Sequence, residues 1–159
     1  MVFSYMETKN LLTKKVVSVT TVNETNFDSN VKKYIARLFS DSPNLIYGLH
    51  KIKILRKIGG GNFDYYDVHL VHWYTLNSTI KVIPLCLNTV GTKGVRYPYA
   101  VNGKYIKIES FLKNEWCLLK ENMPLYMAVS CYLLCRYLYK KNMKYQNKII
   151  RELDIDKRK

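Results

Sequence analysis

The 159-residue sequence predicts a single α+β domain with an antiparallel sheet, an early amphipathic helix and a long C-terminal helix. Three observations predict this class. The first half holds strand-like segments, residues 29–39 have helical periodicity, and the last third is first apolar and then basic. A hydrophobic content of 48% is enough to form a core. We expect an N-terminal arm (1–13), an α+β domain (14–141) and a basic C-terminal tail or helix extension (142–159).

Three short segments have the composition of strands, since β-branched and apolar residues dominate them. They are VVSVTTV (16–22), residues 80–87 and residues 105–108. Asp28 is a suitable N-cap for a helix over residues 29–39. Apolar residues three or four apart form one face of this helix, namely Val31, Ile35, Leu38 and Phe39.

The segment KIKILRKIGGGNFDYYDVHLVHWY (51–74) has three consecutive glycines, which could form a phosphate-binding loop or a hairpin turn. A phosphate-binding loop needs Lys and then Ser or Thr after its last glycine, leading into a helix, but Asn-Phe-Asp follows here. Isoleucine and lysine alternate before the glycines. After them, apolar or aromatic residues recur at every second position: Tyr66, Val68, Leu70, His72 and Tyr74. The pattern therefore predicts a β-hairpin.

The C-terminal third predicts a long helix. Pro124 suits a first helical turn, and residues 125–139 are almost wholly apolar or aromatic. These residues would extend about 22 Å, which is less than the roughly 30 Å hydrocarbon core, and Arg136 interrupts the run. A helix buried in the core is therefore favoured over a transmembrane helix. Beyond the run, bases spaced by 4, 4 and 3 share one helical face: Lys140, Lys144, Lys148 and Arg151.

The formal net charge is +14, from 26 Lys and Arg against 12 Asp and Glu. Acids are absent from residues 42–63, 68–108 and 136–151, although each stretch contains several bases. Such stretches indicate a basic face rather than an even mixture of charges. A negatively charged partner would compensate the self-repulsion of this face. Nucleic acid, an acidic protein and an anionic membrane surface all meet that requirement.

The sequence does not predict an enzyme or a cofactor. It has no G-x-S-x-G motif and no Cys beside a base in a recognisable signature. The four cysteines lack the spacing of a disulfide framework, and without an apolar signal core we expect a reducing, cytosolic setting. Cys131 and Cys135 share a helical face, but His69 and His72 would point to opposite sides of a strand. We therefore expect no metal site.

Fourteen tyrosines are an excess for this length. Several lie near bases, where aromatic rings could stack on the bases of a single-stranded nucleic acid. Tyrosine is equally suited to membrane and protein interfaces, because one end of the side chain is apolar and the other can be hydrated. A/T-rich coding sequence would also enrich Tyr together with Lys, Asn and Ile. A viral, non-enzymatic single-stranded RNA- or DNA-binding protein is therefore the alternative function, although no RNA- or DNA-binding motif is present.

The order of the early elements resembles the matrix proteins of rhabdoviruses, in particular the small basic ones of plant-infecting members. The elements that carry the resemblance are the strand VVSVTTV, the helix opened by Asp28, the segment LIYGLHKIKILRKIGGG and a strand with two histidines. The similarity covers approximately residues 14–74. Animal-virus members often begin with a proline-rich tail that carries budding motifs. Here no proline precedes Pro43, so the resemblance does not imply recruitment of budding machinery through such a tail.

The resemblance implies a viral structural protein. In the virion it would lie on the inner face of the envelope, and in the host it would lie in the cytoplasm and at the inner surface of the membrane. Such a protein would self-associate and bridge an anionic membrane, as a peripheral protein, to the viral nucleocapsid. Each base near an anionic bilayer contributes about 1 kcal/mol to binding. The residues that we expect to bind the membrane or another acidic partner are Lys51, Lys53, Arg56, Lys57, Lys140, Lys144, Lys148 and Arg151.

Overall fold

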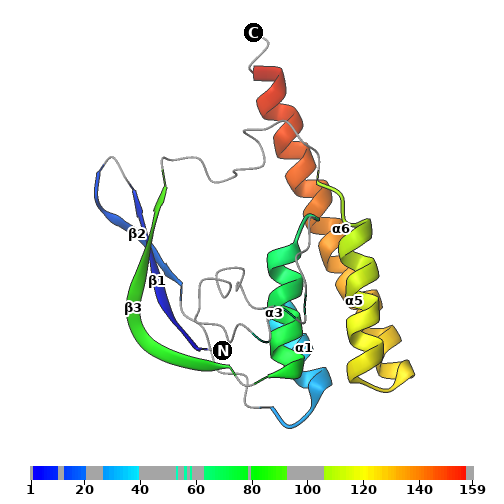
Figure 1. The fold of residues 1–159 in the computed structure, drawn as a ribbon. Coiled ribbons are helices and arrows are strands. Elements are labelled where there is room, and N and C mark those ends of the chain that lie inside the picture. The colour runs from blue at the N-terminus through cyan, green and yellow to red at the C-terminus, as the bar shows by residue number, and fades with distance from the viewer. Residues whose placement is uncertain are drawn as a thin grey trace.

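A computed structural model describes residues 2–10, 13–20, 27–39, 53, 56, 58, 63–78, 80–92 and 106–156. Within these residues, four helices pack together and three strands form a sheet to one side of them (Figure 1). The helices are α1 (Asn30–Leu38), α3 (Tyr66–Asn77), α5 (Glu109–Asn122) and α6 (Leu125–Asp156). The strands are β1 (Val2–Asn10), β2 (Val16–Thr20) and β3 (Lys81–Thr92).

The predicted α+β fold with an antiparallel sheet is wrong. The described part of the chain is mostly helical, and its hydrophobic core is formed by the helices and the residues that flank them. The sheet has the order β2-β1-β3, in which β1 is antiparallel to β2 but parallel to β3. The parallel pair is possible because the chain from β1 to β3 is long enough for a crossover connection.

Two predicted strands are present in this sheet, because β2 lies within residues 16–22 and β3 covers most of residues 80–87. The central strand β1 instead comes from residues 1–13, which the sequence presented as an N-terminal arm. The division of the chain at residues 13/14 and 141/142 stays a prediction, and α6 continues without a break through the second of these boundaries.

Helix α1 confirms the predicted helix over residues 29–39, although its N-cap is Ser29 rather than Asp28. The expected apolar face is only partly covered, because Ile35 and Phe39 are exposed. The most deeply buried side chain of α1 is Tyr34, which is 0% exposed and reaches towards α5. Tyr34 therefore turns towards the core and makes a polar contact there.

Helix α3 replaces the predicted second strand of the hairpin. The side chains of α3 are buried on several sides of the helix. Apolar residues therefore occupy both faces of the predicted strand, and the hydrophobic pattern shows neither a strand period nor a helix period clearly. A buried helix and a buried strand cannot be distinguished by periodicity in such a run, but its length of 12 residues favours a helix. The predicted first strand is wrong as well, because its described residues, Lys53, Arg56 and Ile58, are helical. The three glycines of the predicted turn lie outside the described residues.

The predicted strand over residues 105–108 is also wrong, since residues 106–108 pair with no strand and lead directly into α5. A side chain of α6 takes the place of a neighbouring strand there. The backbone N–H of Ile106 donates to Asn147 Oδ1 at 2.9 Å, and Asn147 Nδ2 donates to the Ile106 carbonyl at 3.3 Å. Asn147 thereby ties the C-terminal half of α6 to the segment that leads into α5.

Candidate functional site

Six of the eight predicted binding residues lie within the described part of the chain. Lys53 and Arg56 are exposed, whereas Lys51 and Lys57 lie outside the described residues. The other four are exposed on α6, and together we call them the basic stripe: Lys140, Lys144, Lys148 and Arg151. The structure therefore assembles the C-terminal half of the predicted site on one element.

The basic stripe follows one face of α6. With about 100° of rotation per residue, spacings of 4, 4 and 3 keep the four side chains within an arc of about 80°. The rise from Lys140 to Arg151 is about 16 Å. Residues 136–151 contain six bases and no acid, so no carboxylate within this stretch reduces the local positive potential.

The same face of α6 continues towards its N-terminus with apolar side chains. Tyr126, Val129, Leu133 and Tyr137 are 68%, 39%, 55% and 64% exposed, and we call them the apolar stripe. Ala128, Cys131 and Cys135 lie on the opposite side of the helix and are buried. The expectation of a buried core helix over residues 125–139 is therefore correct for one face and wrong for the other. None of the helices in the described part of the chain is both long enough and apolar enough to cross a membrane.

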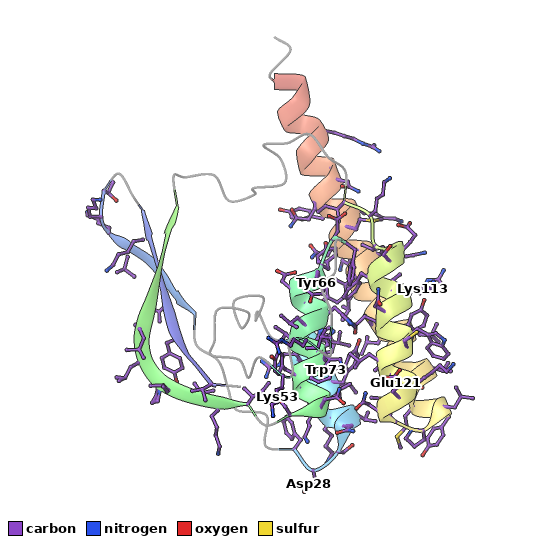
Figure 2. All side chains as sticks on the ribbon, in the orientation of Figure 1. Asp28, Lys53, Tyr66, Trp73, Lys113 and Glu121 are labelled. Carbon is purple, nitrogen blue, oxygen red and sulfur yellow. The ribbon has the colours of Figure 1, made fainter. Side chains whose placement is uncertain are left out.

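A second group of ionisable side chains lies at the centre of the helical core. Glu115 of α5 is 0% exposed, and three side chains surround its carboxylate. Nδ1 of His69 lies 2.6 Å from Oε1, Nδ1 of His72 lies 2.8 Å from Oε2, and the Tyr34 hydroxyl donates to Oε2 at 2.5 Å. Side chains of α3 and α5 fill the space between these two helices (Figure 2). We call Tyr34, His69, His72 and Glu115 the Glu115 cluster.

The surroundings of Glu115 keep it ionised. Burial by itself raises the pKa of the carboxyl group, but the charge of His72 and the hydrogen bonds from His69 and His72 outweigh it and lower the pKa to about 2. An ionised carboxylate only accepts hydrogen bonds, so both imidazoles donate through Nδ1–H. Burial, and then the charge of Glu115, raise the pKa of Tyr34 well above its usual value, so the phenol remains a donor.

The Glu115 cluster connects three helices rather than presenting a reactive group to solvent. Tyr34 comes from α1, both histidines come from α3, and Glu115 comes from α5. Burial, and then the negative charge of Glu115, raise the pKa of the Cys135 thiol. A buried, protonated thiol is a poor nucleophile. The arrangement fits a structural role, in which a buried charge is fully hydrogen-bonded.

The Glu115 cluster was not predicted from the sequence. On the expected strand, His69 and His72 would have faced opposite sides, whereas on α3 a spacing of three places them on one face. A signal for Glu115 was present nonetheless. It is flanked at helical spacing by Phe111, Leu118 and Leu119, all buried, so the acid occupies the apolar face of α5.

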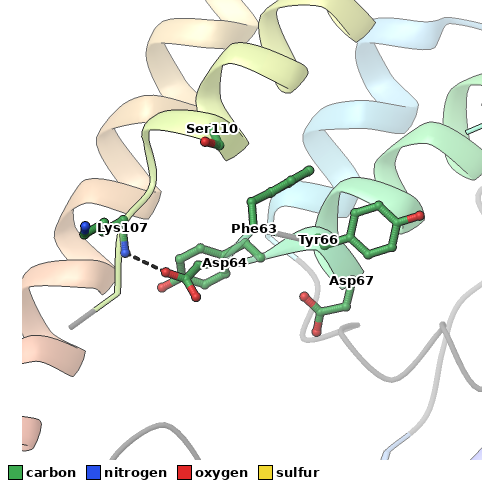
Figure 3. A pocket seen from close by; sticks show the side chains of 7 residues that line it. Phe63, Asp64, Tyr66, Asp67, Lys107 and Ser110 are labelled. Atoms are coloured by element: carbon green, nitrogen blue, oxygen red, sulfur yellow. Dashed lines mark hydrogen bonds between the residues drawn. The ribbon is translucent and has the colours of Figure 1, made fainter. Parts of the chain in front are cut away.

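An open pocket of about 490 Å³ lies where α3 and α5 begin (Figure 3). Its lining residues are Phe63, Asp64, Tyr65, Tyr66, Asp67, Lys107 and Ser110. Asp64 Oδ2 accepts a hydrogen bond from the backbone N–H of Lys107 at 2.7 Å, and Asp67 Oδ1 accepts one from the backbone N–H of Val68 at 2.9 Å. Both acids therefore stabilise the local backbone, and we assign no chemistry to this pocket.

Metal binding finds no support in the residues that the structure describes, since none of their His, Cys, Asp and Glu side chains form a group of three that could hold an ion. No protein-family model, curated protein or solved structure matches the chain. The predicted similarity to rhabdovirus matrix proteins stays a prediction, and the strand with two histidines that helped to carry it is helix α3.

Proposed function

We propose that the protein is a non-enzymatic viral structural protein, similar in role to a matrix protein, which binds an anionic surface through α6. In this role it associates with itself and bridges the inner face of a membrane to the nucleocapsid. The observation that carries the proposal is the basic stripe, whose four bases are exposed on one face of a single helix.

The charge of the basic stripe agrees with this role in magnitude. At about 1 kcal/mol for each base near an anionic bilayer, four bases contribute about 4 kcal/mol, or roughly a thousandfold in affinity. Such binding is reversible and decreases as salt screens the charges. It also needs no pocket, which fits a surface that acts through its field rather than through a shaped cavity.

Co-sedimentation with phosphatidylserine vesicles tests the proposal. We expect the native chain to sediment with the vesicles at near-physiological salt. A variant with Lys140, Lys144, Lys148 and Arg151 all changed to Glu should lose the interaction by at least a hundredfold. Its thermal stability should remain within a few degrees of the native value, since all four side chains are exposed.

A matched control reverses the same number of exposed bases elsewhere, namely Lys32, Lys81, Lys107 and Lys113. Both variants have the same net charge, so a general charge effect would weaken them equally. Equal loss in the two variants would contradict an assignment to α6. Transfer of the native chain from vesicles to added single-stranded RNA would instead identify a nucleic-acid-binding protein, whose affinity should decrease steeply with salt.

A further inference from the structure

We infer that the anionic partner of α6 is the lipid bilayer rather than the nucleocapsid, with the apolar stripe inserted among the lipids and the basic stripe on their phosphates. The inference rests on the proposed function and assigns one of its two anionic partners to this helix. It follows from the continuity of the two stripes along one face.

The two stripes form a single straight line. From Tyr126 to Arg151 the spacings are 3, 4, 4, 3, 4, 4 and 3, so the pattern repeats every 11 residues. Eleven residues make almost a whole number of helical turns, and the line therefore drifts little around a straight helix. It extends about 37 Å, and its apolar and basic halves can contact one surface together.

A bilayer supplies both chemistries at the depths where the helix needs them. Its phosphates lie a few ångströms above hydrocarbon, and an interfacial helix buries its apolar side chains about 5–10 Å into that boundary. A slight tilt of α6 would lower the apolar stripe into the acyl chains and leave the basic stripe at the phosphates. Tyr126 and Tyr137 bracket Val129 and Leu133, and tyrosine prefers such an interface because its hydroxyl can remain hydrated.

Nucleic acid fits only half of this face. Its phosphate backbone could bind the basic stripe, and tyrosines could stack on unpaired bases. Val129 and Leu133 have no aromatic ring to stack, yet they are 39% and 55% exposed in the middle of the apolar stripe. Contact with a phosphate backbone would leave both side chains without an apolar partner.

A second copy of the chain is also a poor occupant. Two parallel α6 helices would place the basic stripes against each other, and antiparallel helices aligned end to end would place bases against the apolar stripe. Residues 136–151, which hold the basic stripe, contain no carboxylate that they could offer to the same segment of another copy. Pairing restricted to the apolar stripes would bury only a few side chains, which is small for a stable dimer.

The test changes the apolar stripe and leaves the charge intact. The variant carries Tyr126→Ser, Leu133→Ser and Tyr137→Ser, three exposed positions whose loss should not unfold the core. We expect its affinity for phosphatidylserine vesicles to decrease roughly tenfold or more, because inserted apolar area contributes to the binding free energy. Its binding to single-stranded RNA should equal that of the native chain.

A matched control removes three similarly exposed apolar side chains elsewhere, through Phe39→Ser, Leu85→Ser and Leu87→Ser. These residues are 65%, 60% and 62% exposed, and their loss should leave vesicle binding unchanged. A separate Leu133→Trp variant measures insertion directly. We expect brominated lipids to quench its fluorescence by more than they quench the native Trp73 and Trp116.

The possible outcomes separate this inference from the proposed function. Vesicle binding that survives loss of the apolar stripe but not reversal of the basic stripe would overturn the inference and leave the proposed function standing. A change of oligomeric state without a change in vesicle binding would assign the apolar stripe to a second copy and also overturn it. Native protein that binds no vesicles at all would contradict both.

Discussion

The Glu115 cluster and the basic stripe of α6 use ionisable side chains in opposite ways. Glu115 is fully buried and accepts hydrogen bonds from three side chains on two other helices. The bases of the stripe are exposed, and they lie in a stretch, residues 136–151, that contains six bases and no acid. One region holds an ionised group inside the fold, whereas the other presents bases at the surface.

The difference between the two regions separates stability from binding. Removing one member of a buried, hydrogen-bonded group leaves its partners without hydrogen bonds in the core, where each unsatisfied polar group is costly. Removing an exposed base leaves nothing unsatisfied in the core, and its main effect is on the surface potential. We therefore expect substitutions in the Glu115 cluster to change the free energy of unfolding, and substitutions in the basic stripe to change affinity.

The largest expected effect on stability comes from Glu115→Ala. Without the carboxylate, two imidazoles and a phenol lose a shared acceptor in the core, which should lower the free energy of unfolding by about 3–5 kcal/mol. Chemical denaturation followed by circular dichroism measures the loss. Glu121→Ala, at the exposed end of α5, is the matched control and should change stability by less than about 0.5 kcal/mol. Equal effects of the two variants would contradict the structural role of Glu115.

Acid should weaken the fold through the same carboxylate. Its pKa is lowered from the ordinary value of 4.5 to about 2 in the folded protein, so the folded state binds its proton less readily than the unfolded state. The associated stability, about 3 kcal/mol, is present above pH 4.5 and is lost as the pH decreases towards 2. Denaturation curves at several pH values measure how steeply the free energy of unfolding decreases as the pH is lowered. A Glu115→Gln variant should lose this contribution, and an unchanged slope would show that other groups cause it.

The smallest of these effects is expected for Tyr34→Phe. The ring remains in place and the two imidazoles still donate to Glu115, so only the hydrogen bond of the phenol is lost. The free energy of unfolding should decrease by about 1–2 kcal/mol, as measured by denaturation. Tyr126→Phe removes an exposed hydroxyl and should have no measurable effect. A loss as large as that of Glu115→Ala would show that the phenol is essential to the whole cluster.

The basic stripe could be predicted from the sequence better than the Glu115 cluster could. Spacing alone placed Lys140, Lys144, Lys148 and Arg151 on one face, because a long helix after Pro124 leaves little freedom in where the side chains point. The apolar stripe was assigned to the core, since apolarity does not reveal which side of a helix its neighbours cover. Here Ala128 and Cys135 face the core, while larger Leu133 and Tyr137 remain exposed.

Prediction of the Glu115 cluster required knowing whether residues 66–74 form a strand or a helix, and the local sequence pattern does not distinguish the two. Every second residue from Tyr66 to Tyr74 is apolar or aromatic, but Val71 and Trp73 between them are apolar too, so a strand and a helix fit equally well. The choice of strand separated His69 from His72 and concealed the acceptor that they share. The parallel partner of β1 was equally inaccessible, because its pairing with β3 joins residues about eighty positions apart.

The two hydrogen bonds between Asn147 and Ile106 affect how this protein is oriented when α6 binds a surface. They attach the C-terminal half of α6 to the segment that leads into α5, while Cys131 and Cys135 pack the N-terminal half into the core. A surface that fixes the direction of α6 would therefore fix the direction of the whole helical core. Molecules bound side by side through this helix would all turn the same face outward, and the next layer of an assembly would meet a uniform surface.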